Sequence, residues 1–119
     1  MQVINLNQKF SLFNDHWNPK IIGELNGQSI KLAKVKGEFV WHNHQHEDEL
    51  FFVIKGKLKI EFADKIVEIN EGEMIIVPKG VEHKPIAEEE VLLMLFEPNT
   101  LKHTGEVKSE LTVEKCERI

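Results

Sequence analysis

A chain of 119 residues, of which 41% are hydrophobic, is long enough to bury one core, so we expect a single domain spanning residues 1–119. The formal charge of −5, with lysines scattered among the acids, argues against a nucleic-acid partner, and no apolar run approaches a membrane span. Cys116 is the only cysteine, and the start lacks the pattern of a secretory signal, so the expected location is the reducing cytoplasm.

The first nineteen residues contain the one helix that we expect. Asn5 or Asn7 can act as the N-cap of a short helical segment that reaches Phe13. The dipeptide Asn18-Pro19 then ends this segment, because proline cannot continue a helix.

From residue 20 onward, the chain has the pattern of short strands. Asn26-Gly27 is a two-residue hairpin signal, and alternation of apolar and charged residues over 57–62 predicts a strand with one wet face. The acidic run 88–90 is expected to be a solvated turn. Strands are expected at 20–25, 29–35, 49–54, 57–62, 66–69, 74–77 and 91–96, with an edge strand at 110–114. Strands that recur about every ten residues predict an all-β sandwich or barrel.

Two segments carry four of the six histidines. In the first, His42 and His44 lie two residues apart, so in a strand they project to one face, about 7 Å apart along the backbone. His46 shares this parity only if the strand continues, and the acids after it favour a bend. Either Asp48 or Glu49 can reach the same ion, and Glu49 is the better candidate because it opens the next strand.

The second segment ends at His83. Pro78 and Gly80 predict a tight turn, and His83 follows it at the start of a strand. Imidazoles and carboxylates are ligands of divalent transition metals. Histidines at a strand end also suit a solvated loop, and for His42 and His44 alone the two interpretations are evenly balanced.

Taken together, the two segments resemble the two signature motifs of the cupin superfamily. The first motif is matched by Gly37, His42-Asn43-His44, Glu49 and Gly56, with one residue fewer than usual before the histidine pair. The second is matched by Gly72, Pro78, Gly80 and His83, with Ala87 in place of the final asparagine. The resemblance covers residues 37–87. The chain is similar in particular to small single-domain cupins that are loosely labelled mannose-6-phosphate isomerase-like. That label describes the domain and not the reaction.

The resemblance implies a fold and a metal site. The fold would be an antiparallel jelly-roll β-barrel of six to eight strands, the double-stranded β-helix, here with a short N-terminal helical segment. The metal would be a single divalent ion, Mn, Fe, Ni, Co or Zn, held by His42, His44, Glu49 and His83 in the barrel mouth. Such an ion keeps open positions for water, dioxygen or a small-molecule ligand.

The surroundings of this site are predicted by strand parity. His46 is interpreted either as a loop histidine at the cavity mouth or as a catalytic acid or base. The expected cavity wall consists of Phe39, Trp41, Phe51, Val53, Met94 and Phe96.

Three functions remain open at this point. The first is a metal-dependent enzyme, of dioxygenase or isomerase/lyase type, acting on a small organic molecule. The second is a non-catalytic small-molecule or metal-binding module with a regulatory role, and the third is a storage-like barrel whose site has no function. We expect a homodimer, because edge strands of small β-proteins need cover and symmetric dimers are the commonest assemblies.

Overall fold

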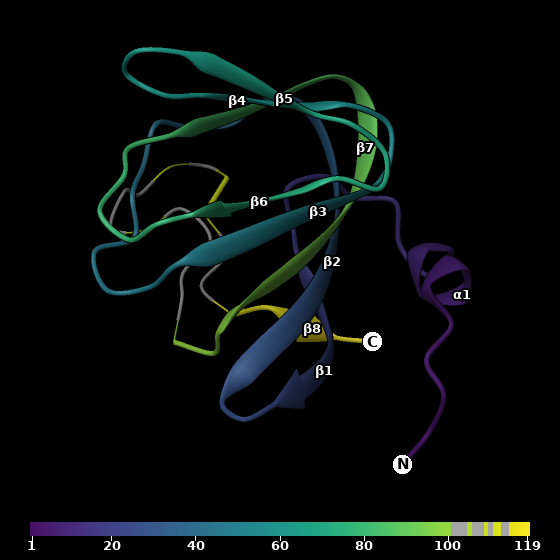
Figure 1. Ribbon diagram of the computed structural model, residues 1–119. Helices are drawn as coiled ribbons and strands as arrows, with labels where there is room; N and C mark the ends of the chain where they lie inside the picture. The colour runs from purple at the N-terminus through teal and green to yellow at the C-terminus, as the bar shows by residue number, and fades with distance from the viewer. Residues whose placement is uncertain (101–104, 106–108, 110, 113–114) are drawn as a thin grey trace.

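The computed structural model describes residues 1–100, 105, 109, 111–112 and 115–119, and within them one helix and eight strands are found (Figure 1). The elements are α1 (Leu6–Phe10), β1 (Lys20–Leu25), β2 (Gln28–Glu38), β3 (Glu49–Lys55), β4 (Leu58–Glu61), β5 (Ile66–Ile69), β6 (Met74–Val77), β7 (Lys84–Pro98) and β8 (Glu117–Arg118). No helix in this described part of the chain has the length and apolar character needed to cross a membrane.

The N-terminal helix α1 is shorter than expected. Asn5 is its N-cap, and its side-chain oxygen accepts a hydrogen bond from the backbone N–H of Gln8 at 2.9 Å. The helix ends at Phe10 and not at Phe13 as predicted. Ser11 is the C-cap, and its hydroxyl donates a hydrogen bond to the Gln8 carbonyl at 2.6 Å, so a side chain takes up a carbonyl that a continuing helix would use. The chain then turns, and Phe10 and Phe13 both pack against Leu32 of β2.

Strand β7 organises the sheet. Strand β2 pairs along one edge of β7, from Gln28↔Pro98 to Glu38↔Ile86. The other edge is shared, because β4 pairs near the beginning of β7 and β3 pairs near its end. Strand β7 is strongly curved (Figure 1), so its two halves belong to two layers, one with β4 and β5 and the other with β3 and β6.

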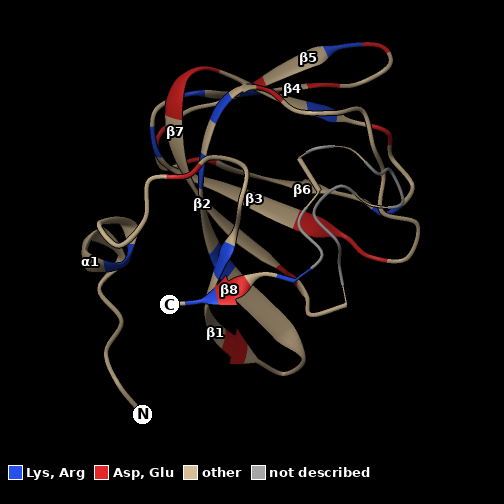
Figure 2. Cartoon of the chain, turned by 180° about the vertical axis from the view of Figure 1, so that it is seen from behind, with Lys and Arg blue, Asp and Glu red and all other residues tan. Residues whose placement is uncertain are grey.

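The acidic run 88–90 lies at the bend of β7 and is not the turn that the sequence suggested. All three glutamates are exposed but remain within the strand, seen as a red stretch on β7 in Figure 2. Opposite them, the register with β2 shifts between Val35 and Gly37, and Gly37 has a φ of +87°. A bulge of this kind bends the paired strands, which here allows β7 to serve both layers.

The predicted all-β class is confirmed, but the predicted closed barrel is not found among the described residues. Strand β5 pairs only with β4 and β6 only with β3, so the sheet stays open between them. Pairing is antiparallel except that β8 runs parallel to β1. Of the edge strand expected at 110–114, residues 110, 113 and 114 lie outside the described residues, and Leu111 and Thr112 are not in a strand.

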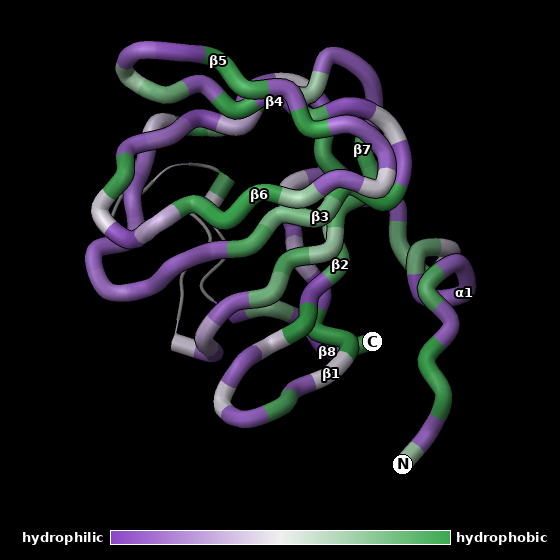
Figure 3. Tube along the Cα trace, viewed as in Figure 1, coloured by the Kyte–Doolittle hydropathy of each residue, from purple (hydrophilic) through white to green (hydrophobic). Residues whose placement is uncertain are grey.

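The core lies between the two layers. Many of its buried members come from β3, β4 and β7, at inward positions two residues apart, and include Val53, Leu58, Ile60, Val91 and Leu93. Figure 3 shows hydrophobic stretches on the strands and hydrophilic ones on most connections. At one end of this core the inward positions become polar, and the candidate site lies there.

Candidate metal centre

Four of the side chains predicted to bind a metal lie together in the interior. His42 and His44 come from the connection between β2 and β3, Glu49 is the first residue of β3, and His83 directly precedes β7. All four are at most 5% exposed. Each offers one ligand atom, and these atoms lie within 4.8 Å of one another. The structure therefore brings together the four residues that the resemblance grouped as ligands, and their binding of a metal stays a prediction.

The backbone explains how residues 41 positions apart in the sequence meet. His42 and His83 form an isolated antiparallel bridge, with N–H···O bonds of 3.0 Å and 2.9 Å in the two directions. The turn before His83 is also tied to the first segment, because Gly80 donates its N–H to the His44 carbonyl at 2.8 Å. Asp48 accepts from the Lys79 N–H at 2.8 Å, so this carboxylate holds the turn, and Glu49 supplies the acidic group of the cluster.

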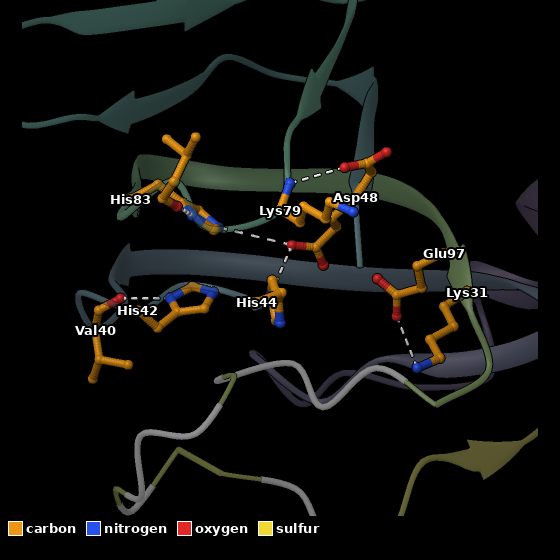
Figure 4. A network of polar contacts seen from close by, with 10 residues as sticks. Lys31, Val40, His42, His44, Asp48, Lys79, His83 and Glu97 are labelled. Atoms are coloured by element: carbon orange, nitrogen blue, oxygen red, sulfur yellow. Dashed lines mark hydrogen bonds and ion pairs between the residues drawn. The ribbon is translucent and has the colours of Figure 1, made fainter. Parts of the chain in front are cut away.

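Hydrogen bonds to backbone carbonyls orient two of the rings (Figure 4). His42 Nδ1 lies 2.9 Å from the Val40 oxygen, and His83 Nδ1 lies 2.9 Å from the Val81 oxygen. A carbonyl can only accept, so each Nδ1 carries the hydrogen and each Nε2 keeps a free lone pair. This arrangement is typical of metal-bound histidines, in which a partner fixes the tautomer.

Unsatisfied acceptors make the cluster suited to a cation. The Nε2 atoms of His44 and His83 and Oε1 of Glu49 are buried without a hydrogen-bond partner in the described part of the protein. Burying an unsatisfied polar atom costs about 1–3 kcal/mol, which a bound cation would offset. The Glu49 oxygen lies 3.2 Å from His44 Nε2 and 3.8 Å from His83 Nε2. Metal–ligand bonds of about 2.0–2.2 Å place adjacent ligand atoms roughly 3 Å apart, so these residues fit a divalent transition metal.

The protonation states also suit metal binding. Burial, with the nearby charge of His83, lowers the pKa of His42 from its ordinary 6.5 to about 4. Burial alone would raise the pKa of Glu49, but the contacts from His44 and His83 outweigh it and lower this pKa. His42 is therefore neutral and Glu49 ionised at neutral pH, and these are the forms that bind a metal.

A buried ion pair lies next to this cluster and was missed in the sequence. Figure 4 shows Glu97 of β7 with Lys31 of β2, whose Nζ lies 2.8 Å from Glu97 Oε1. Burial and the neighbouring charge of Glu49 raise the pKa of Glu97, against the opposing charge of Lys31. Odd-numbered residues of β2 and β7 face inward near this end, and that alternation was the available signal.

A small apolar cavity adjoins the cluster on another side. It is lined by His42 and Glu49 together with Trp17, Pro19, Ala33, Val35, Phe39, Phe51, Pro85, Leu93 and Leu95. The expected roles of Phe39 and Phe51 are confirmed, whereas Val53 lies in the core without lining this cavity.

Besides Val53, three further residues that were predicted to line the cavity do not line it. Met94 and Phe96 are not in the lining, because the inward positions of β7 are the odd ones. Trp41 is 41% exposed and also does not line the cavity. Trp17 was missed, because it belongs to the N-terminal segment and to neither motif.

His46 is separate from the four clustered residues. It is exposed in the connection before β3 and lines, with His44, a shallow pocket of about 80 Å³. This position agrees with a histidine near a cavity mouth, and its acid or base role stays a prediction. His103 lies outside the described residues.

Comparisons with known proteins agree with this geometry. The family model described as the cupin domain matches residues 30–107. A crystal structure of a cupin-2 domain containing protein from Shewanella frigidimarina is 55% identical with a TM-score of 0.81, over 82% of this chain and 95% of that one. Protein NMB1881 from Neisseria meningitidis is 36% identical with a TM-score of 0.76, over 82% of this chain and all of its own.

Among curated proteins, similarity is confined to part of the chain. The uncharacterized protein YdbB of Bacillus subtilis is 39% identical over 64 residues, which cover 53% of this chain and 57% of YdbB. The chain thus spans somewhat more than half the length of this relative. The matching family model, the similarity to the Shewanella structure and the order of both motifs show that this chain belongs to the cupin superfamily, as a small cupin-domain protein.

Proposed function

We propose that this cupin holds one divalent transition metal, Mn, Fe, Ni, Co or Zn, through His42, His44, Glu49 and His83, and acts on a small organic molecule bound beside it. The observation that supports this most strongly is the set of buried, unpartnered ligand atoms within 4.8 Å of one another. A bound ion of this kind supplies Lewis-acid chemistry and positions for a small-molecule ligand.

An enzyme, of dioxygenase or isomerase/lyase type, is our first proposal for the role of this centre. The buried pair Lys31–Glu97 supports it, because an ionisable group beside a metal ligand can hold a proton close to a bound molecule. The alternative is a non-catalytic small-molecule or metal-binding module with a regulatory role. Both use the same four ligands, so the metal must be tested before the reaction.

The first test is metal content and affinity after chelation and reloading. We expect one equivalent of metal in the parent protein, measured by elemental mass spectrometry, and roughly 100-fold weaker binding or more in His83→Gln. The matched control is His46→Gln, which removes an exposed histidine from the same mouth and should keep one equivalent. Equal metal content in parent and His83→Gln, or no metal in either, would refute the proposed centre.

The second test separates the enzyme from the binding module. Protein loaded with iron is screened for oxygen consumption, and protein loaded with the other metals for isomerisation or elimination of small organic substrates. Metal-dependent turnover that His83→Gln abolishes would support an enzyme. Tight retention of a small molecule without turnover would favour the module.

We also propose a cytoplasmic homodimer. Within the described part of the chain, β5 and β6 each pair along one edge only, and they carry exposed apolar side chains, Ile66, Met74 and Ile76. The N-terminal Val3 is also fully exposed. Free edges and apolar patches of this kind favour association with a second copy. Light scattering at micromolar concentration should give twice the mass of 13.8 kDa, and a monomeric mass would contradict the proposal.

A further inference from the structure

The apolar cavity beside the candidate metal centre is small and has a definite composition. Its free volume is about 30 Å³, and apart from His42 and Glu49 its lining residues are apolar. A cavity needs roughly 10–15 Å³ for one water molecule, and an apolar cavity of about 150 Å³ accommodates benzene. The present cavity therefore has room for about two or three carbon atoms, and not for an aromatic ring.

Trp17 closes this cavity from a segment that precedes the first strand. Its indole stacks on Phe39, with ring centroids 4.6 Å apart and planes at 16°. The indole Nε1 donates to the Lys36 carbonyl at 2.8 Å, and the Trp17 backbone N–H donates to the Lys34 carbonyl at 2.9 Å. The polar atom of the indole is therefore satisfied by β2, and the ring serves as an apolar wall.

The backbone of Trp17 is held in an uncommon conformation. Its φ is +57°, in the left-handed region that bulky residues rarely adopt. Such conformations persist only where the surroundings impose them, and they cluster at binding sites. Here the two hydrogen bonds to β2 and the stack on Phe39 impose it, so the position of the indole is fixed.

The cavity also borders the atoms that would hold a ligand. His42 and Glu49 belong both to its wall and to the metal-binding cluster, and Phe39 meets the edge of His42 with ring centroids 5.4 Å apart. A molecule bound at the metal can therefore extend one group into the cavity. A hydroxyl or charged group placed there would lose its hydrogen bonds to water against mostly apolar walls, which is unfavourable.

We propose that Trp17 sets ligand size at this site, so that the preferred ligand joins a metal-binding polar end to a short alkyl group of two or three carbons. This inference rests on the proposed metal centre and adds the chemical class of its ligand. Polyhydroxylated sugars and ligands with an aromatic ring at this position are excluded by the same walls.

The experiment uses alkyl and aryl hydroxamates, which chelate divalent metals through the same polar end and differ only in the attached group. The protein carries Trp41→Phe, so that Trp17 is the only one of the two tryptophans left to report binding by fluorescence. Metal content is measured first on the same samples. We expect propionohydroxamate to bind about fourfold more tightly than acetohydroxamate, as for burial of one methylene, and to change the Trp17 emission. Benzohydroxamate should bind no better than acetohydroxamate.

Enlarging the cavity should reverse this order. Trp17→Ala, followed by calorimetry, should bind benzohydroxamate at least tenfold more tightly than the parent does and lose the preference for propionohydroxamate. Trp41→Ala is the matched control, since it removes an indole that does not line the cavity, and it should keep the parental order. If Trp17→Ala does not fold, Trp17→Phe can be used, since it removes less of the wall. It should shift the preference toward benzohydroxamate in the same direction, by a smaller factor.

The outcomes distinguish the inference from the proposed function. Protein without metal after reloading would refute the metal centre and, with it, the ligand class. Protein that retains one equivalent of metal but binds all hydroxamates equally, binds none, or prefers benzohydroxamate in the parent would overturn the role of Trp17 alone.

Discussion

Acid should destabilise the metal-free protein through His42. The pKa of this buried imidazole is about 4 in the folded protein against an ordinary value of 6.5. Between these two values the unfolded chain binds a proton on His42 that the folded protein does not. The free energy of unfolding therefore falls as pH falls. The contribution of His42 is fully present above pH 6.5 and is lost as pH approaches 4.

The size of this effect follows from the difference between the two pKa values. At 1.36 kcal/mol per pKa unit, His42 accounts for about 3 kcal/mol. For 119 residues, an unfolding entropy of about 2.1 cal/mol/K per residue converts this into a fall in Tm of about 12 °C. Other groups titrate in the same range, so the effect is isolated by comparison with His42→Gln, which keeps a neutral side chain of similar polarity.

The assay is thermal and urea unfolding of chelator-treated protein between pH 7.5 and pH 4. The stability advantage of the parent over His42→Gln should shrink by about 3 kcal/mol across this range. The control His46→Gln removes an exposed imidazole and should run parallel to the parent. Parallel curves for the parent and His42→Gln would refute the conclusion that His42 is buried in its neutral form.

Four further single substitutions and one double variant test the packing by urea unfolding. Lys31→Met should destabilise the protein by about 3–5 kcal/mol at pH 8, because it leaves the buried Glu97 carboxylate unpaired. Adding Glu97→Gln to the Lys31→Met variant should recover most of this loss. A double variant as unstable as Lys31→Met alone would show that the pair is not coupled. Gly56→Ala should cost about 2–3 kcal/mol, because φ is +96° and the new Cβ would lie 3.0 Å from a backbone oxygen. Gly72→Ala, with φ +79° and no atom within 4 Å of the new Cβ, should cost about 1 kcal/mol. Equal losses for Gly56→Ala and Gly72→Ala would contradict the role of the close contact at Gly56. Phe10→Ala should cost about 3–5 kcal/mol by unpacking α1 from β2, and a loss below about 1 kcal/mol would show that the helix contributes little.

Three members of the metal-binding cluster could be predicted from the sequence because their spacing is local. His42 and His44 share a face by strand parity, and Glu49 opens the next strand with its own face fixed by the alternation of burial along β3. These are short-range rules, and each of them holds across a few residues. The addition of His83, 41 residues after His42, rested on the resemblance to the second cupin motif.

Features that depend on long-range geometry were not predictable. The prediction placed Met94 and Phe96 at the cavity, but the odd positions of β7 are the buried ones on both sides of the run 88–90. A continuous apolar stretch has no alternation that would indicate its inward face. Trp17 reaches the cavity through contacts with β2 that no periodicity indicates. Whether the sheet closes depends on pairing between β5 and β6, which their separate sequences do not encode.

The sharing of β7 by both layers has a consequence for how the chain folds. Strand β2 ends at Glu38 and its partner β7 begins at Lys84, so every β2–β7 contact closes a loop of more than forty residues. Non-local pairing of this kind slows folding, because loop-closure entropy is lost before contacts are gained. During synthesis, β2, β3 and β4 must wait for residues up to 98 to leave the ribosome before they find their common partner. Until then β2, β3 and β4 can pair only with β1, β6 and β5, so one edge of each and their apolar faces stay exposed. Chaperones would therefore matter most for the nascent chain in the interval before β7 emerges.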